Sequence, residues 1–148
     1  MASQFTQIHA TKKQRLGTRK KDAAGNEYIY LTGVASTVAG SWVAYDELGI
    51  TALLDTDVAA TLVSPVAVAQ AATVASTFGW YMIFGKCLAN VEASFADNSK
   101  IFAVATAGSA DDAGTAGNQL VGAYGRSAIA SGQATVQLVY PVCGVNVA

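Results

Sequence analysis

The stretch that decides the fold reads Gly79-Trp80-Tyr81-Met82-Ile83-Phe84-Gly85. Its five central residues are large and apolar, so both faces of an extended chain would carry apolar side chains here. A strand of this kind belongs in the centre of a sheet that is covered on both sides. The run is short for a buried helix and is bounded by glycine at each end. We therefore predict a central strand over 79–85 with Trp80 in the core.

Short runs rich in aromatic and β-branched residues continue in both directions from this strand, and glycines separate them. Their spacing of about eight to twelve residues is typical of a sandwich or barrel. Helix signals are weak throughout the chain. The sequence thus predicts an all-β fold, a small β-barrel or β-tulip-like body, with strands over 28–34, 41–46, 62–69, 79–85, 89–95, 100–105, 118–124 and 133–140.

The charge distribution divides the chain into two parts. No acidic residue precedes Asp22, whereas the residues from that point on carry three basic residues against all ten acidic ones, a net charge of −7. Residues 1–25 also lack apolar periodicity, so we predict a flexible basic N-terminal arm over 1–25 and a β-rich body over 26–148. The arm holds six of the nine basic residues: Lys12, Lys13, Arg15, Arg19, Lys20 and Lys21.

The composition argues against a membrane protein. The longest uncharged stretch, 58–85, is interrupted by polar residues at short intervals and is better interpreted as two strands with a turn. The basic N-terminal residues are not followed by the apolar segment of a secretory signal. We expect a soluble protein made in a cytoplasm. Charged residues make up only 13% of the chain, about half of the usual share, which predicts that copies or a partner cover part of the surface.

Residues for catalysis are scarce. The single histidine, His9, lies in the predicted arm without a fixed carboxylate or nucleophile near it. Carboxylate pairs are interpreted as turn caps rather than as a catalytic or metal site. We expect no enzyme, no cofactor, no metal and no catalytic residues. The carboxylates concerned are Asp46, Glu47, Asp55, Asp57, Asp111 and Asp112.

The two cysteines, Cys87 and Cys143, lie far apart and form no metal-binding or redox motif. In a reducing compartment this spacing favours two buried thiols over a disulfide. The sequence alone leaves their pairing open.

The basic arm is the one candidate binding segment, and all six of its basic residues are candidate partner-binding residues. Arms of this kind bind nucleic-acid phosphates or acidic protein surfaces. Because 12–21 contains no aromatic residue and the body has no basic face to extend a groove, docking to protein is favoured over nucleic acid. Deleting 1–22 is then expected to leave the body folded and to weaken attachment to the partner.

The order of the glycine and aromatic motifs over 27–142 resembles that of the head-decoration (cement) proteins of tailed bacteriophages. The resemblance implies a β-barrel or β-tulip-like body that binds the outside of an expanded capsid, commonly as a trimer. The motifs that carry it are Tyr28-Ile29-Tyr30-Leu31, Gly33-Val34-Ala35, Gly40-x-Trp42-Val43-x-Tyr45-Asp46, Val66-Ala67-Val68-Ala69, Phe78-Gly79-Trp80, Gly85, Thr106-Ala107-Gly108 and Val121-Gly122-Ala123.

The resemblance makes the leading hypothesis a structural virion protein that stabilises a phage capsid. Its expected partners are the major capsid protein and itself, as a homotrimer or a dimer. Its expected location is the capsid surface of the virion, with host cytoplasm during assembly. One alternative is a tail-tube or head–tail connector subunit, which would form rings without a capsid. A second alternative is a small nucleic-acid-binding protein that uses the basic arm.

Overall fold

The structure, a computed structural model, describes residues 4–145. Strands account for 44% of the chain and helices for 8%, so the prediction of an all-β fold is confirmed. The strands form one antiparallel sheet of eleven strands that is not closed, which leaves the predicted barrel without support. In chain order the elements are η1 (Gln4–Thr6), β1 (Ile8–His9), β2 (Arg19–Lys21), β3 (Glu27–Thr32), β4 (Trp42–Tyr45), β5 (Thr51–Leu53), α1 (Thr56–Thr61), β6 (Ser64–Ala69), β7 (Phe78–Asn90), β8 (Lys100–Ala103), β9 (Ala110–Asp111), η2 (Ala116–Asn118), β10 (Gln119–Gly125) and β11 (Gln133–Cys143).

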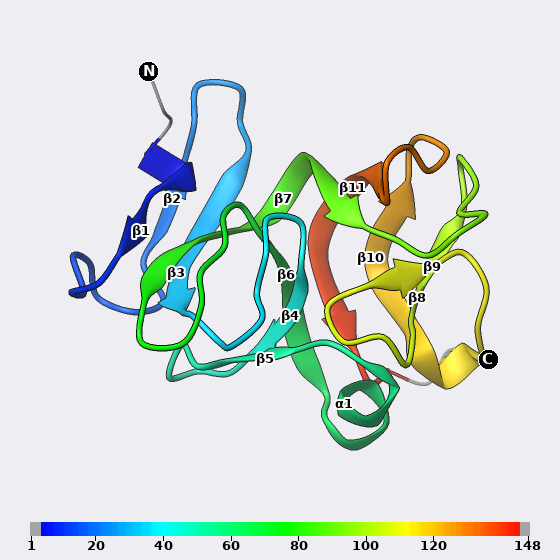
Figure 1. The fold of residues 1–148 in the computed structure, drawn as a ribbon, viewed down its shortest axis with the longest axis horizontal. Helices are drawn as coiled ribbons and strands as arrows, with labels where there is room; N and C mark the ends of the chain where they lie inside the picture. The colour runs from blue at the N-terminus through cyan, green and yellow to red at the C-terminus, as the bar shows by residue number, and fades with distance from the viewer. Residues whose placement is uncertain (1–3, 146–148) are drawn as a thin grey trace.

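The long strand β7 organises the sheet. Its first half pairs with β3, two of its residues pair with the end of β6, and its second half pairs with β11. The change of partner occurs near Gly85, whose φ of +121° is open to glycine and strained for other residues. β1, β2 and β3 consequently lie at one end of the long axis of the molecule, and β8, β9 and β10 at the other (Figure 1).

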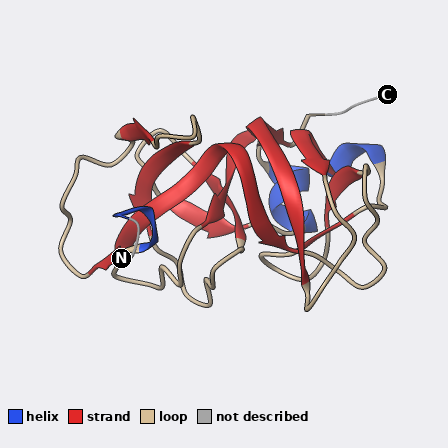
Figure 2. Cartoon of the chain, turned by 90° about the horizontal axis from the view of Figure 1, so that it is seen from above, coloured by secondary structure: helices blue, strands red, loops and turns tan. Residues whose placement is uncertain are grey.

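The sheet buries two separate groups of apolar side chains, because β3, β4, β6 and the first half of β7 are covered on both faces. Trp80 and Met82 enter the larger core, and Tyr81 and Ile83 enter the smaller one. This alternation is the one expected from a two-faced central strand. Trp80 is 2% exposed, so its predicted burial is confirmed. Figure 2 shows the strands sweeping across the molecule with only small helical segments beside them.

Most predicted strands match an observed one. The predictions over 28–34, 41–46, 62–69, 100–105, 118–124 and 133–140 fall on β3, β4, β6, β8, β10 and β11 in turn. Those over 79–85 and 89–95 are wrong as separate strands, because β7 runs through Gly85 to Asn90 and the chain then turns. The sequence did not predict β5, α1 or β9, nor the short strands of the N-terminal segment.

The expected N-terminal arm is part of the folded structure over residues 4–25. Phe5 is 5% exposed and its ring stacks on Tyr28, with centroids 3.9 Å apart. β1 pairs with β7, and β2 pairs with β3 at the edge of the sheet. The prediction of an extended arm over 1–25 is therefore wrong for these described residues, because apolar anchors and backbone hydrogen bonds fix the segment on the body. Residues 1–3, within the predicted arm, and 146–148, within the predicted body, lie outside the described residues.

Buried tyrosines predict a loss of stability at alkaline pH. Burial raises the pKa of Tyr81 and of Tyr28 to about 12, from an ordinary value of 10. The unfolded chain then loses these protons before the folded chain does, so stability is intact below about pH 10 and falls as the pH rises toward 12. We expect the urea midpoint to decrease across this window. Tyr81→Phe should shrink that decrease, because it removes one of the two buried hydroxyls.

Candidate interaction surface

The six basic residues predicted to bind a partner lie on two neighbouring pieces of the chain. Arg19, Lys20 and Lys21 form β2, which pairs with β3 and is the first strand in the order of the sheet. Lys12, Lys13 and Arg15 lie on the segment between β1 and β2. The structure therefore brings the six residues to one end of the molecule, but it gives them different surroundings.

Two of the six cations neutralise a buried carboxylate. Glu27 is 7% exposed at the start of β3, where it faces Lys21 across the β2–β3 pair. Arg19 Nη1 lies 3.6 Å from Glu27 Oε2, and Lys21 Nζ lies 4.0 Å from Oε1. The hydroxyl of Tyr140 on β11 donates to the same Oε1 at 2.9 Å, and this hydrogen bond raises the pKa of Tyr140. Arg19 and Lys21 thus form ion pairs with a carboxylate of the neighbouring strand at the edge of the sheet.

Glu27 was not recognised as a functional or structural residue from the sequence, because no local motif surrounds it. We predict that Glu27→Ala lowers the free energy of unfolding by about 0.5–1.5 kcal/mol, because it removes the acceptor of the Tyr140 hydroxyl and the partner of two largely exposed cations, whose ion pairs are screened by solvent. Glu27→Gln should cost less because it keeps an acceptor for Tyr140. Urea unfolding of both variants and of Tyr140→Phe measures this. Equal midpoints for Glu27→Ala and the parent would contradict the role of the carboxylate.

Lys20 points to the opposite face of β2. Its Nζ lies 5.6 Å from the ring centroid of Trp80, within the range of a cation–π contact. That ring also meets Phe5 and Tyr30 edge-on, with centroids 5.4 and 5.1 Å away. Lys20 is half-buried, and its ammonium lies over the edge of the aromatic cluster.

The other three basic residues form an exposed cationic loop, which comprises Lys12, Lys13 and Arg15. None of their side chains makes an ion pair with another residue of the described range 4–145. The backbone of the loop is nevertheless fixed. The hydroxyl of Tyr30 contacts Nδ1 of His9 at 2.8 Å and accepts from the backbone N–H of Lys13 at 3.1 Å. The three charges therefore sit on an ordered support rather than on a loose tail.

Glycine completes the support of this cationic loop. Gly17 adopts a φ of +88°, and its N–H donates to the carbonyl of Tyr30 at 2.8 Å. Leu16 packs against the larger core next to it. His9, which the sequence placed in a solvated tail, is half-buried against the Tyr30 ring instead. A partner that binds this loop would meet preorganised charges and pay little ordering entropy.

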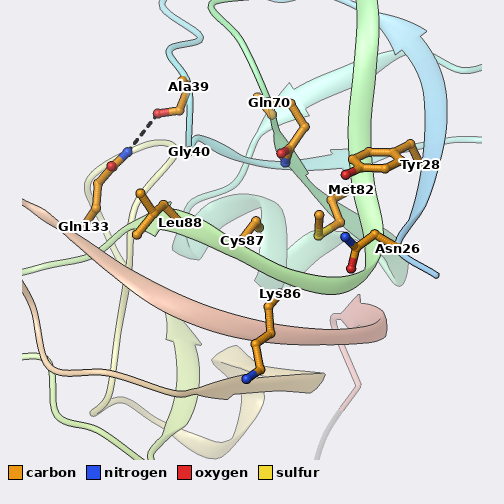
Figure 3. A pocket seen from close by; sticks show the side chains of 11 residues that line it. Asn26, Tyr28, Ala39, Gly40, Gln70, Met82, Lys86, Cys87, Leu88 and Gln133 are labelled. Atoms are coloured by element: carbon orange, nitrogen blue, oxygen red, sulfur yellow. Dashed lines mark hydrogen bonds between the residues drawn. The ribbon is translucent and has the colours of Figure 1, made fainter. Parts of the chain in front are cut away.

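A cavity of about 350 Å³ opens beside β7 at its bend (Figure 3). Asn26, Gln70 and Gln133 supply amide groups to its lining, whereas the side chain of Lys86 extends away from them (Figure 3). Cys87 also lines the cavity, but burial raises its pKa to about 12, so it stays a neutral thiol and a poor nucleophile at ordinary pH. The amide groups of the lining offer hydrogen-bond donors and acceptors to an occupant.

The carboxylates interpreted as turn caps include two clear examples. Asp55 caps α1 by accepting from the N–H of Val58 at 2.8 Å, and Asp46 accepts from the N–H groups of Leu48 and Ile50, each at 3.0 Å. Among residues 4–145, no group of three or more histidine, cysteine or acidic side chains is placed to hold a metal ion. Cys87 and Cys143 are both free thiols.

Comparison of the chain with models of protein families and with curated proteins finds no match. In the part of the chain that the structure describes, no helix has the length and apolar character needed to cross a membrane.

Proposed function

We propose that this chain is a structural virion protein that binds and stabilises the outside of a tailed-phage capsid, with the major capsid protein as its partner. The observation that carries the proposal is the cationic loop of Lys12, Lys13 and Arg15. It holds three charges that form no ion pair within residues 4–145 on an ordered support, whereas the chain after residue 21 has a net charge of −7. A surface of this kind is suited to docking on an acidic protein face.

The remaining surface supports an assembling rather than a solitary protein. Large apolar side chains are exposed at several places, including Leu48 at 66% and Val63 at 75%. Such side chains are covered when copies or partners pack together. On a capsid lattice, several modest contacts per molecule add to firm attachment. In this proposal the protein resides on the capsid surface of the virion, after synthesis in the host cytoplasm.

Binding to expanded capsids at low occupancy tests the proposal. We expect the triple variant K12S/K13S/R15S to bind at least roughly tenfold more weakly at low salt than the parent, with a smaller dependence on salt, because exposed charge pairs are screened over about 8–10 Å. Lys13→Ser and Lys86→Ser form a matched pair of exposed single-lysine changes, and only the first should weaken binding. Capsid binding that is unchanged by the triple variant at both low and high salt would refute this role of the loop.

The same preparation separates the alternatives. Rings of the purified protein together with no binding to capsids would favour a tail-tube or connector subunit. Retention on duplex DNA that decreases steeply with salt would favour a nucleic-acid-binding protein. Both measurements use the full chain.

A further inference from the structure

A second cavity, of about 400 Å³, lies along β10 next to β8. β10 and β8 pair at Gln119 and again at Tyr124, and the register shifts between these two pairs. Lys100 and Arg126 both line the cavity. These are two of the three basic residues that follow Lys21 in the sequence. The cavity therefore gathers two positive charges in a part of the chain that is otherwise acidic.

The arginine of this cavity is held in place. Arg126 Nη1 donates to Asn98 Oδ1 at 3.2 Å and to the carbonyl of Gly125 at 3.4 Å, and the guanidinium carbon lies 5.4 Å from the Tyr124 ring centroid. Neither Arg126 nor Lys100 forms an ion pair within residues 4–145. A guanidinium has five donors in a planar fork that suits a carboxylate.

The same cavity has an apolar side. Val121 is 39% exposed and Tyr124 is 40% exposed, and both line it. A fitting occupant therefore combines a carboxylate with an adjacent apolar side chain.

The turn between β4 and β5 offers this combination. Asp46 accepts hydrogen bonds from two backbone N–H groups of the turn, and Gly49, with φ of +80°, donates back to the Asp46 carbonyl at 3.0 Å. The tip is thus preorganised, with Glu47 and Leu48 exposed on it. Leu48 is 66% exposed, and Glu47 forms no ion pair inside the described range.

The turn and the cavity lie at different ends of the molecule. The carbonyl of Gly49 accepts from the N–H of Thr32, at the end of β3, and Gly49 lies against Leu16. The turn therefore belongs to the end that carries β1, β2 and β3, whereas the cavity belongs to the end that carries β8 and β10 (Figure 1). A single rigid copy does not fill its own cavity with this turn, whereas a second copy placed head to tail could bring its turn there.

We propose that the Glu47–Leu48 tip of one copy inserts into the Lys100–Arg126 cavity of a second copy of this chain. The carboxylate of Glu47 pairs with the two cations, and the side chain of Leu48 packs on Val121 and Tyr124. Because different surfaces of the two copies meet, the contact is heterologous and produces a closed ring, such as a trimer, or an open filament. This inference goes beyond the proposed function, because it concerns contacts between copies and requires no capsid.

The test measures the self-association of the purified full chain by sedimentation velocity over a range of concentrations at low salt. We expect a species larger than a monomer, and we expect Glu47→Lys and Arg126→Glu each to raise the dissociation constant by roughly thirtyfold or more. Combining both changes in one chain should restore association, because the charges are then exchanged at every contact between copies. Asp57→Lys and Lys86→Glu change the net charge equally at exposed positions and should have no such effect.

Circular dichroism and a thermal melt establish that each variant is folded, and Leu48→Ser gives a second, charge-independent measure of the same contact. A parent that is monomeric at every concentration would overturn the proposal. Equal weakening by the control variants, or no recovery on charge exchange, would also overturn it. Capsid binding of the full chain is measured separately. A chain that binds capsids but stays monomeric would contradict this contact and leave the proposed function standing. A chain that self-associates but does not bind capsids would do the opposite.

Discussion

Trp80→Ala is expected to lower the free energy of unfolding by about 3–5 kcal/mol, the usual cost of truncating a buried tryptophan. Trp80 is 2% exposed in the middle of the sheet. Its ring contacts Phe5 and Tyr30 edge-on, and Lys20 lies over it. The substitution would remove an apolar group and also the surface on which the N-terminal segment packs, so the protein cannot relax around the change without losing other contacts.

Urea unfolding of Trp80→Ala measures this cost, with two comparisons. Trp80→Phe keeps an aromatic ring and should therefore lower the free energy of unfolding by less than Trp80→Ala does. Phe84→Ala removes a half-buried ring from the same strand, and it should also lower the free energy of unfolding by less than Trp80→Ala does. If the midpoint of Trp80→Ala agreed with that of the parent, the assignment of Trp80 to the core would be wrong.

The central strand could be predicted from the sequence because its signal is local. A run of five large apolar residues between glycines indicates an extended segment that is buried on both faces. The structure places Trp80 and Tyr81 in different cores, as alternation along a strand requires. The other strong predictions, such as those for β3 and β11, also depend on side-chain pattern within the strand itself.

The length of β7 could not be predicted in the same way. Gly85 was interpreted as the end of a strand, because glycine usually interrupts strand patterns. In the structure it is the point where β7 bends and exchanges its partners β3 and β6 for β11. Whether glycine ends a strand or bends it depends on which strands are available to pair with the residues that follow, and those lie far away in the sequence.

The N-terminal segment was misinterpreted for a related reason. Six cations in a segment without apolar periodicity are typical of a disordered arm. A single aromatic residue, Phe5, and a single leucine, Leu16, anchor the segment to the larger core. Anchors this sparse give no periodic signal. The sequence identified the six basic residues, but it did not show their different surroundings. Arg19 and Lys21 contact Glu27 and Lys20 contacts Trp80, and these contacts depend on where β3 and β7 lie.

Deletion of residues 1–22 has the largest effect that the structure predicts. The sequence alone favoured an intact body after this deletion, whereas the contacts indicate the opposite. The deletion removes the Phe5 ring, which stacks on Tyr28. It also removes β2, which pairs with β3, and the two cations that pair with Glu27. Loss of a buried phenylalanine alone costs about 3–5 kcal/mol. With the other losses, the cost is comparable to the whole stability of an ordinary domain, about 5–15 kcal/mol.

We therefore expect the truncated chain to be largely unfolded or aggregated at room temperature. Near-ultraviolet circular dichroism and urea titration measure this. The triple variant K12S/K13S/R15S is the matched control, because it removes charge from the same segment but keeps Phe5, Leu16 and β2. It should unfold at nearly the same urea concentration as the parent, since surface changes of this kind usually stay within about 0.5 kcal/mol each. A truncated chain that unfolds cooperatively at the parent's midpoint would show that 1–22 is an appendage after all.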